Sequence, residues 1–161
     1  MDHLIVITTG GTIDKVYFDD LSDFKVGDPQ IIRVFEQMNI SFRWEVRQLM
    51  RKDSLQLNDA DRQLIHDTIK TSDAKHFLIT HGTDSMVDTA KMLKGLDDRV
   101  IILTGALNPA SFVGSDAMFN IGCAVGAVQT LKPGIYIAMN GRVWDPFKVK
   151  KNRDMNRFEP A

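Results

Sequence analysis

Hydroxyl and glycine residues gather in this sequence directly after two apolar runs. The motif TTGGT at 8–12 follows the first run, and THGTD at 80–84 follows the second. A threonine hydroxyl becomes a useful nucleophile only when a neighbouring group accepts its proton, and glycine lets a substrate approach the backbone closely. Thr12 and Thr83 are therefore candidates for nucleophilic catalysis, although Thr12 taken alone can also be an ordinary turn residue.

A base for such a hydroxyl can come from a lysine whose ammonium is taken out of water. We identify Lys151 as the candidate, with Thr83 as a proton relay and Asp84 holding the lysine or gripping a substrate ammonium. Other interpretations stay open at this stage. Thr83 or Asp84 can cap the helix expected to begin near Ser85, and Lys151 can belong to a solvated basic segment beside Lys150.

The histidines and the single cysteine favour structural roles. His81 has no serine or cysteine partner in its motif, so we predict a packed or hydrogen-bonded side chain. The four histidines lack metal-site spacing, and Cys123 is the only cysteine, so we expect no metal, no internal disulfide and a buried, inert thiol. The double glycine matches neither a dinucleotide-binding motif nor a phosphate-binding loop, so no cofactor is expected.

The elements that must position these residues form a regular alternation. Runs of aliphatic residues without polar alternation are typical of parallel strands buried on both faces. We expect strands near 4–7, 42–49, 77–80, 99–103 and 134–139, and helices near 29–38, 58–69, 85–95 and 114–131. This order predicts a single α/β domain with a mostly parallel, doubly wound sheet and helices on both faces. Ligands bind beyond the carboxyl ends of such strands.

Three segments fall outside the alternation of long strands and helices. Residues 14–29 mix aromatic and charged side chains without a period, and we interpret them as a loop that is either a mobile lid or an ordinary surface crossover. Residues 142–144 should return from a turn at Asn140-Gly141. The tail, 146–161, shows no clear period.

Length and composition narrow the class of protein. A chain of 161 residues is the size of one domain, and 43% hydrophobic with 25% charged residues is ordinary for a soluble globular protein. A net charge of -1 argues against a nucleic-acid surface. Without an apolar run of about 20 residues or a basic flank at the start, we expect no membrane association and a cytoplasmic location.

Two motifs also carry a family resemblance. TTGGTID at 8–14 and THGTDSM at 80–86 resemble the signature motifs of the L-asparaginase and glutaminase-asparaginase family, and ILTGALNP at 102–109 and VKK at 149–151 extend the likeness. The resemblance covers nearly the whole chain but only the family's larger N-terminal domain. We therefore expect residues 1–161 to be an asparaginase-like N-terminal domain without the C-terminal one.

The resemblance implies hydrolysis of the side-chain amide of L-asparagine, or of L-glutamine, through an acyl-enzyme and without a cofactor. Thr12 matches the family's primary nucleophile, and Thr83, Asp84 and Lys151 match its second triad. The substrate-binding residues that follow from it are Gly11, Asp53, Ser54, Gly82 and Asp84.

The chain departs from the family pattern at two places near this site. Phe24 stands where many members carry a loop tyrosine that activates the first threonine, so we expect Tyr17, the only tyrosine in that loop, to take the role. Leu55 follows Ser54 where the family usually has a polar substrate contact.

These inferences lead to an amidohydrolase that acts on a small molecule, without nucleic acid, as a homo-oligomer. One rival is a non-catalytic amino-acid-binding or regulatory module that keeps the pocket. Another is a structural remnant, or a subunit that needs a separate partner chain.

Overall fold

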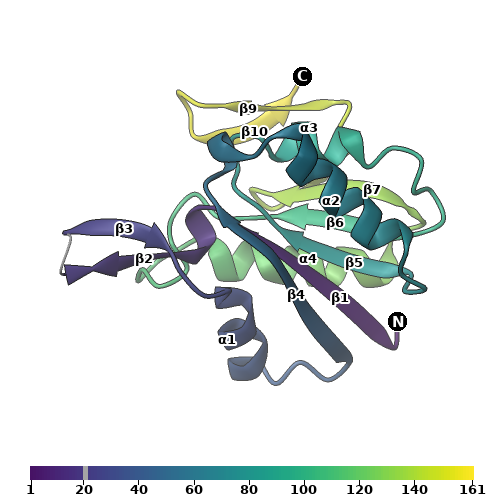
Figure 1. Cartoon of the computed structure of the whole chain (residues 1–161), viewed down its shortest axis with the longest axis horizontal. Helices are drawn as coiled ribbons and strands as arrows, with labels where there is room; N and C mark the ends of the chain where they lie inside the picture. The colour runs from purple at the N-terminus through teal and green to yellow at the C-terminus, as the bar shows by residue number, and fades with distance from the viewer. Residues whose placement is uncertain (20–21) are drawn as a thin grey trace.

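A six-stranded sheet forms the centre of the computed structural model, which describes residues 1–19 and 22–161 (Figure 1). The strand order is β4-β1-β5-β6-β7-β8. The first five strands run parallel and β8 runs antiparallel to β7. The strands are β1 (His3–Gly10), β4 (Arg43–Lys52), β5 (His76–Thr80), β6 (Val100–Thr104), β7 (Gly134–Met139) and β8 (Arg142–Trp144). The predicted α/β fold with a mostly parallel sheet is confirmed, and β4 forms one edge of this sheet.

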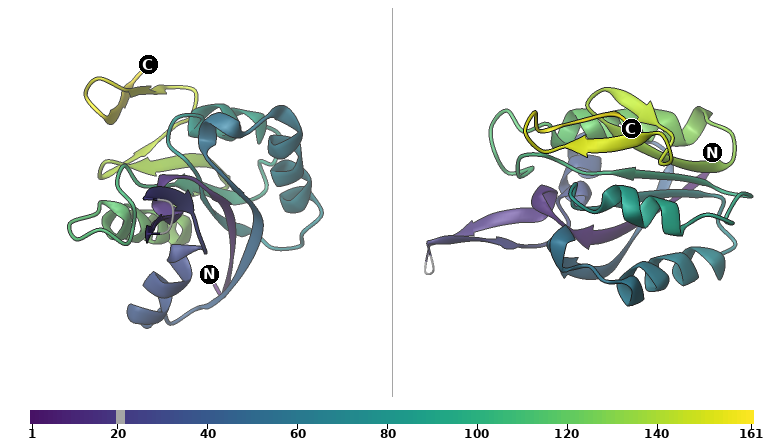
Figure 2. Two further views of the ribbon diagram at one scale, coloured as in Figure 1. Left: turned by 60° about the vertical axis from the view of Figure 1, so that its left-hand side comes forward. Right: turned by 90° about the horizontal axis from the view of Figure 1, so that it is seen from above.

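Two helices cover each face of the sheet (Figure 2). Helices α2 (Asp59–Lys70) and α3 (Met86–Met92) lie on one face, and α1 (Gln30–Gln37) and α4 (Ala117–Thr130) lie on the other. Side chains of a strand alternate between faces. Ile5 and Ile7 of β1 accordingly join the core under α2 and α3, whereas Leu4 and Val6 join the core under α1 and α4. Burial on both faces explains why residues 4–7 of β1 are a continuous apolar run.

The helix ends follow their capping residues. Asn58 caps α2: its Oδ1 accepts a hydrogen bond from the Asp61 backbone N–H at 3.0 Å, and the Asn58 backbone N–H donates to the Asp61 carboxylate. The start of α4 was predicted three residues early. The helix begins after Asp116, whose carboxylate is instead the acceptor for the backbone N–H groups of Leu107 and Asn108.

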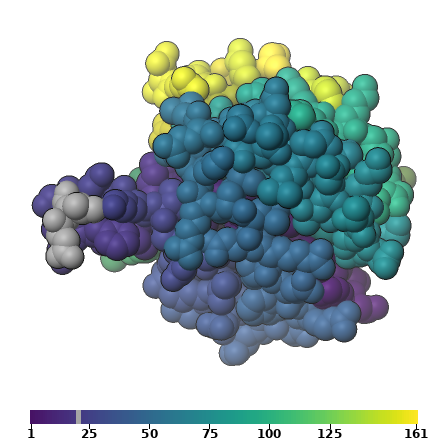
Figure 3. All heavy atoms as spheres, viewed as in Figure 1, coloured from purple at the N-terminus to yellow at the C-terminus, as the bar shows by residue number. Residues whose placement is uncertain are grey.

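Two hairpins were not predicted. Residues 14–29, expected to be a loop, contain β2 (Lys15–Phe18) paired with β3 (Asp23–Val26), and this hairpin projects from the rest of the molecule (Figure 3). Asp20 and Leu21, which belong to the same segment, lie outside the described residues. The tail forms β9 (Val149–Asn152) and β10 (Arg157–Pro160). Four residues are the shortest segment in which alternation identifies a strand, and β2 (KVYF) and β9 (VKKN) do not alternate apolar and polar residues.

Of the helices that the structure describes, none is long and apolar enough to cross a membrane.

Two buried threonine hydroxyls in the sheet have no hydrogen-bond partner among the described residues, and their effect on stability can be tested. Thr8 and Thr80 are neighbours in register on β1 and β5, and neither buried hydroxyl finds a hydrogen-bond partner among the described residues. Thr80→Val should therefore raise the free energy of unfolding by about 1 kcal/mol, because an unsatisfied buried hydroxyl is costly. Urea denaturation measures the change.

Thr104→Val is the matched control. The Thr104 hydroxyl donates to the Ala138 carbonyl at 2.8 Å, so its removal should lower the free energy of unfolding by a similar amount. Equal destabilisation by both substitutions would show that the Thr80 hydroxyl is satisfied in solution.

Candidate active site

Three loops meet at the carboxyl edge of the sheet, and glycines allow them to approach. A methyl group placed on Gly11, after β1, would lie 2.5 Å from the Gly82 Cα, after β5. A methyl group placed on Gly82 would lie 2.7 Å from the Ser54 Oγ, in the loop after β4. Both distances are too short for real side chains, so the two glycines bring the neighbouring Thr12 and Thr83 to the same edge.

The backbone at Gly11 sets the position of Thr12. Gly11 has φ +86°, a conformation that strongly favours glycine, and its N–H donates to the Lys52 carbonyl at 2.8 Å. The chain then enters a short 3-10 turn, η1 (Thr12–Asp14), with Thr12 partly exposed at its first position. The predicted nucleophile thus follows a sharp turn and is accessible to a substrate.

Lys151, Thr83 and Asp84 form a hydrogen-bonded triad. The Lys151 Nζ donates to the Thr83 Oγ1 at 2.7 Å and to the Asp84 Oδ1 at 2.8 Å, although 68 and 67 residues separate them along the chain. The Lys151 side chain is only 13% exposed. Lys150 instead points to Glu159, at 4.0 Å, with most of its side chain in solvent. The structure therefore places Lys151, and not its neighbour, beside Thr83.

Neither Thr83 nor Asp84 caps the following helix. The N-cap of α3 is Ser85, and its hydroxyl donates to the Ser54 carbonyl at 2.7 Å rather than to the helix. This bond ties the loop after β4 to the loop after β5. Thr83 and Asp84 are consequently left to contact Lys151.

The triad can move a proton. As an ammonium, Lys151 donates to both partners and leaves the Thr83 hydroxyl hydrogen free to point elsewhere. With Lys151 as a neutral amine, the bond to Thr83 would run in the other direction, so that the hydroxyl donates to Nζ and its oxygen gains negative character. In that state the Thr83 oxygen can take a proton from a nucleophile.

The loop after β4 holds the predicted substrate-binding residues in different surroundings. Ser54 is buried and begins the 3-10 turn η3 (Ser54–Gln56), which Asp53 caps. The Lys15 ammonium contacts the Asp53 carboxylate at 2.9 Å, and this hydrogen bond lowers the pKa of Asp53. Leu55 is 68% exposed. The Asp53 carboxylate is therefore already engaged, and Leu55 offers an apolar surface.

Tyr17 lies on the projecting hairpin, away from a direct bond to the nucleophile. It pairs across the hairpin with Phe24, with ring centroids 5.4 Å apart, and Phe24 packs edge-on against Phe112 at 5.6 Å. Tyr17 is 52% exposed, and in the part of the chain that the structure describes no hydrogen bond joins it to Thr12. The structure does not bring the predicted activating tyrosine onto Thr12. Directly opposed residues lie on the same face of a hairpin. The Tyr17 side chain therefore lies on the same face of the hairpin as the side chain at position 24.

Two residues near the site were missed from sequence. Arg153, in the turn after β9, places its Nε 3.4 Å from the Asp84 Oδ1. Asp14 is buried at the base of the projecting hairpin, where its carboxylate accepts from the Gln30 N–H at 2.9 Å and its carbonyl accepts from the Gly27 N–H at 2.8 Å. Burial raises the pKa of Asp14 to about 7. The position of Asp14 directly after the TTGGTI run was the available signal.

His81 is a fully buried structural residue, as predicted. Its Nδ1–H donates to the Gly82 carbonyl at 2.7 Å, and its Nε2 accepts from the Thr89 hydroxyl at 2.8 Å. Burial lowers the pKa of His81 to about 4, so the ring is neutral near pH 7. The prediction for Cys123 was too strong, because this thiol is partly rather than fully buried on α4.

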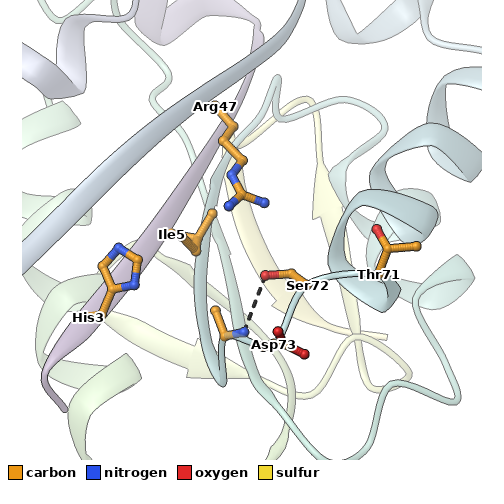
Figure 4. A pocket seen from close by; sticks show the side chains of 7 residues that line it. His3, Ile5, Arg47, Thr71, Ser72 and Asp73 are labelled. Atoms are coloured by element: carbon orange, nitrogen blue, oxygen red, sulfur yellow. Dashed lines mark hydrogen bonds between the residues drawn. The ribbon is translucent and has the colours of Figure 1, made fainter.

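The surface also has a groove at the opposite edge of the sheet. It encloses about 510 Å³ and includes His3, Arg47, Ser72 and Asp73 in its lining (Figure 4). His3 begins β1, whereas Thr12 follows the end of that strand. This groove is therefore separate from the triad. Within residues 1–19 and 22–161, no group of three or more histidine, cysteine or acidic side chains is arranged to hold a metal ion.

The chain belongs to the asparaginase family, since a family model described as "Asparaginase, N-terminal" matches residues 3–159. It is 27% identical to "L-asparaginase 2" of Escherichia coli (strain K12), over 94% of this chain and 47% of the relative. It is 24% identical to "Glutaminase-asparaginase" of Acinetobacter glutaminasificans, over 93% and 50% respectively. The chain thus spans about half the length of these relatives.

A solved structure shares the fold. The thermostable L-asparaginase from Thermococcus kodakarensis superposes with a TM-score of 0.85 at 24% identity, covering 98% of this chain and 51% of that one. The asparaginase-like architecture expected from the motifs is confirmed.

The buried carboxyl of Asp14 predicts a specific pH dependence. Folding raises its pKa from an ordinary 3.8 to about 7, so the folded protein holds this proton more tightly than the unfolded chain does. The free energy of unfolding contributed by Asp14 should therefore fall as the pH rises from about 4 to 7. Asp14→Asn keeps an oxygen that accepts from the Gln30 N–H but does not ionise. The free energy of unfolding of this variant should therefore exceed that of the parent at pH 8 by up to about 4 kcal/mol.

Chemical denaturation between pH 4 and pH 8 measures this difference. Asp73→Asn, at an exposed carboxylate, is the control and should keep the pH dependence of the parent. If the free energy of unfolding of the Asp14 variant changed with pH as it does in the parent, the raised pKa of Asp14 would be contradicted.

Proposed function

We propose that residues 1–161 act as an asparaginase-like N-terminal domain that hydrolyses the side-chain amide of L-asparagine to L-aspartate and ammonia. Membership of the asparaginase family supports amide hydrolysis as the reaction class. The observation that carries the proposal is the Lys151–Thr83–Asp84 triad, assembled next to the glycine contact that positions Thr12. L-Glutamine is the second amide to be tested.

The proposed reaction has two steps. The Thr12 Oγ attacks the amide carbon, the carbon–nitrogen bond breaks, and ammonia leaves with the proton that the hydroxyl has given up. Water then attacks the resulting ester, which releases aspartate and returns a proton to the Thr12 oxygen. Thr83, deprotonated toward Lys151, would take the proton from the attacking group, and Asp84 would hold Lys151 in place.

Activation of Thr12 by Tyr17 belongs to the same proposal and requires the hairpin to move. The Tyr17 ring packs on Phe24 in the present arrangement, with its hydroxyl unconnected to Thr12 by any bond among the residues described. A two-stranded hairpin on its own is only marginally stable, so a substrate contact can change its position at low cost.

The proposed binding shell comes from the three packed loops. Gly11, Ser54 and Gly82 would lie against the substrate backbone, and Asp84 would contact its ammonium. Asp53 would act mainly through Lys15, which neutralises its carboxylate. We propose further that the protein is a cytoplasmic homo-oligomer whose partner is the small-molecule substrate, and light scattering of the purified chain tests the oligomer.

Thr12→Ala should abolish turnover. Removal of a nucleophile that forms a covalent intermediate is expected to lower kcat for ammonia release by about a thousandfold or more. Thr12→Ser keeps a hydroxyl and is the matched variant, which should retain measurable release. Full activity of a folded Thr12→Ala protein, with an unchanged circular dichroism spectrum, would remove Thr12 from the mechanism.

Lys151→Met should show whether activity depends on proton transfer by Lys151 or only on the positive charge of this segment. Methionine retains an apolar stem but cannot move a proton, so kcat should fall by roughly 10²- to 10⁴-fold. The neighbouring Lys150→Met removes the same charge from an exposed position and should stay within about twofold of the parent. Equal losses in the two variants would exclude the triad as the proton carrier.

A second candidate function is an amino-acid-binding module without turnover. The separation of Tyr17 from Thr12, together with a phenylalanine at position 24, favours it. Calorimetry with L-asparagine and L-aspartate, combined with an ammonia assay, discriminates the two. Saturable binding without ammonia release would support the binding module.

A further inference from the structure

Asp84 faces two cations rather than one. Its Oδ1 accepts from the Lys151 Nζ at 2.8 Å and also lies 3.4 Å from the Arg153 Nε. Side chains two residues apart lie on the same side of an extended strand. Lys150 and Asn152, on the other side, both turn toward Glu159, at 4.0 and 3.1 Å. The alternation along β9 therefore directs Lys151 toward Asp84, and Arg153, the first residue of the following turn, reaches the same carboxylate.

The charges of this cluster do not balance. One carboxylate is matched by one ammonium and one guanidinium, which leaves the three side chains with a net charge of one positive unit. An incoming ammonium group would meet a carboxylate that is already engaged and a guanidinium that repels it. The Arg153 side chain is 66% exposed, so water and salt weaken this repulsion but do not remove it.

The Arg153 side chain is not needed to build the turn that carries it. The Asn152 Oδ1 accepts from the Met155 N–H at 3.0 Å, and the Arg153 carbonyl accepts from the Asn156 N–H at 3.3 Å. These bonds use the Asn152 side chain and the backbone. Replacement of the guanidinium should therefore leave the hairpin, and with it Lys151, in place.

We propose that Arg153 determines substrate selectivity at Asp84. It lowers the preference of the site for an α-ammonium group and admits ω-amides in which that group is absent or acylated. This inference rests on the proposed amidohydrolase function, because it assigns the chemistry of the substrate group that Asp84 meets. Arg153 acts here on binding, and the reacting amide is contacted by other residues.

The test compares L-asparagine with succinamate, which is the same ω-amide without the ammonium group. The ratio of kcat/KM for L-asparagine to that for succinamate should rise about fivefold in Arg153→Gln, mainly through a lower KM for L-asparagine. The rise should shrink in about 0.5 M NaCl because salt screens the repulsion. Arg157→Gln removes a second half-exposed arginine, which contacts Glu159 instead, and should leave the ratio unchanged.

An unchanged ratio in Arg153→Gln, or an equal loss on both amides, would overturn the selectivity role. If the parent releases ammonia from neither amide, the proposed function fails, and calorimetry with L-aspartate and succinate decides the inference separately. Arg153→Gln should then tighten L-aspartate relative to succinate by a similar factor. No change in that ratio, or no binding of either acid, would overturn the inference on Arg153.

Discussion

The contact between Gly11 and Gly82 is the constraint on which the candidate site depends. Neither position has room for a Cβ atom, because each backbone lies against the other or against Ser54. Three loops from three parallel strands can therefore stack directly, without side chains between them. Because glycine has no side chain at these two positions, the hydroxyls of Thr12, Ser54 and Thr83 can lie at the same edge of the sheet.

The site combines parts of very different rigidity. Thr83, Ser85 and His81 follow a central strand and are buried, and the His81 ring fixes its own loop through bonds to Gly82 and Thr89. Tyr17 stands on a hairpin that leaves the body of the protein and is joined to it at its base through Asp14. Thr83 of the triad is thus held by the core, whereas Tyr17 lies on a hairpin that contacts the body of the protein at its base and through the packing of Phe24 on Phe112.

The sequence predicts the sheet better than it predicts the site. Runs such as Phe77–Ile79 could be identified as strands because burial on both faces requires continuous apolar side chains. The motifs then located Thr12 and Thr83 at strand ends. Lys151 was a candidate base, but the sequence did not separate it from Lys150, because no local pattern in a lysine-rich tail marks which side chain faces inward. That distinction comes from the pairing of β9 with β10.

The distance along the chain between Asp84 and Lys151 has a consequence for synthesis. The two residues are 67 positions apart, and β5 with its loop leaves the ribosome well before β9. At about 5 to 20 residues per second, the interval is roughly 3 to 13 s. During that time a nascent chain holds Thr12, Thr83 and Asp84 but has no Lys151 with which to complete the triad. The order of translation therefore keeps the Lys151–Thr83–Asp84 triad incomplete until all six strands of the central sheet have been synthesised.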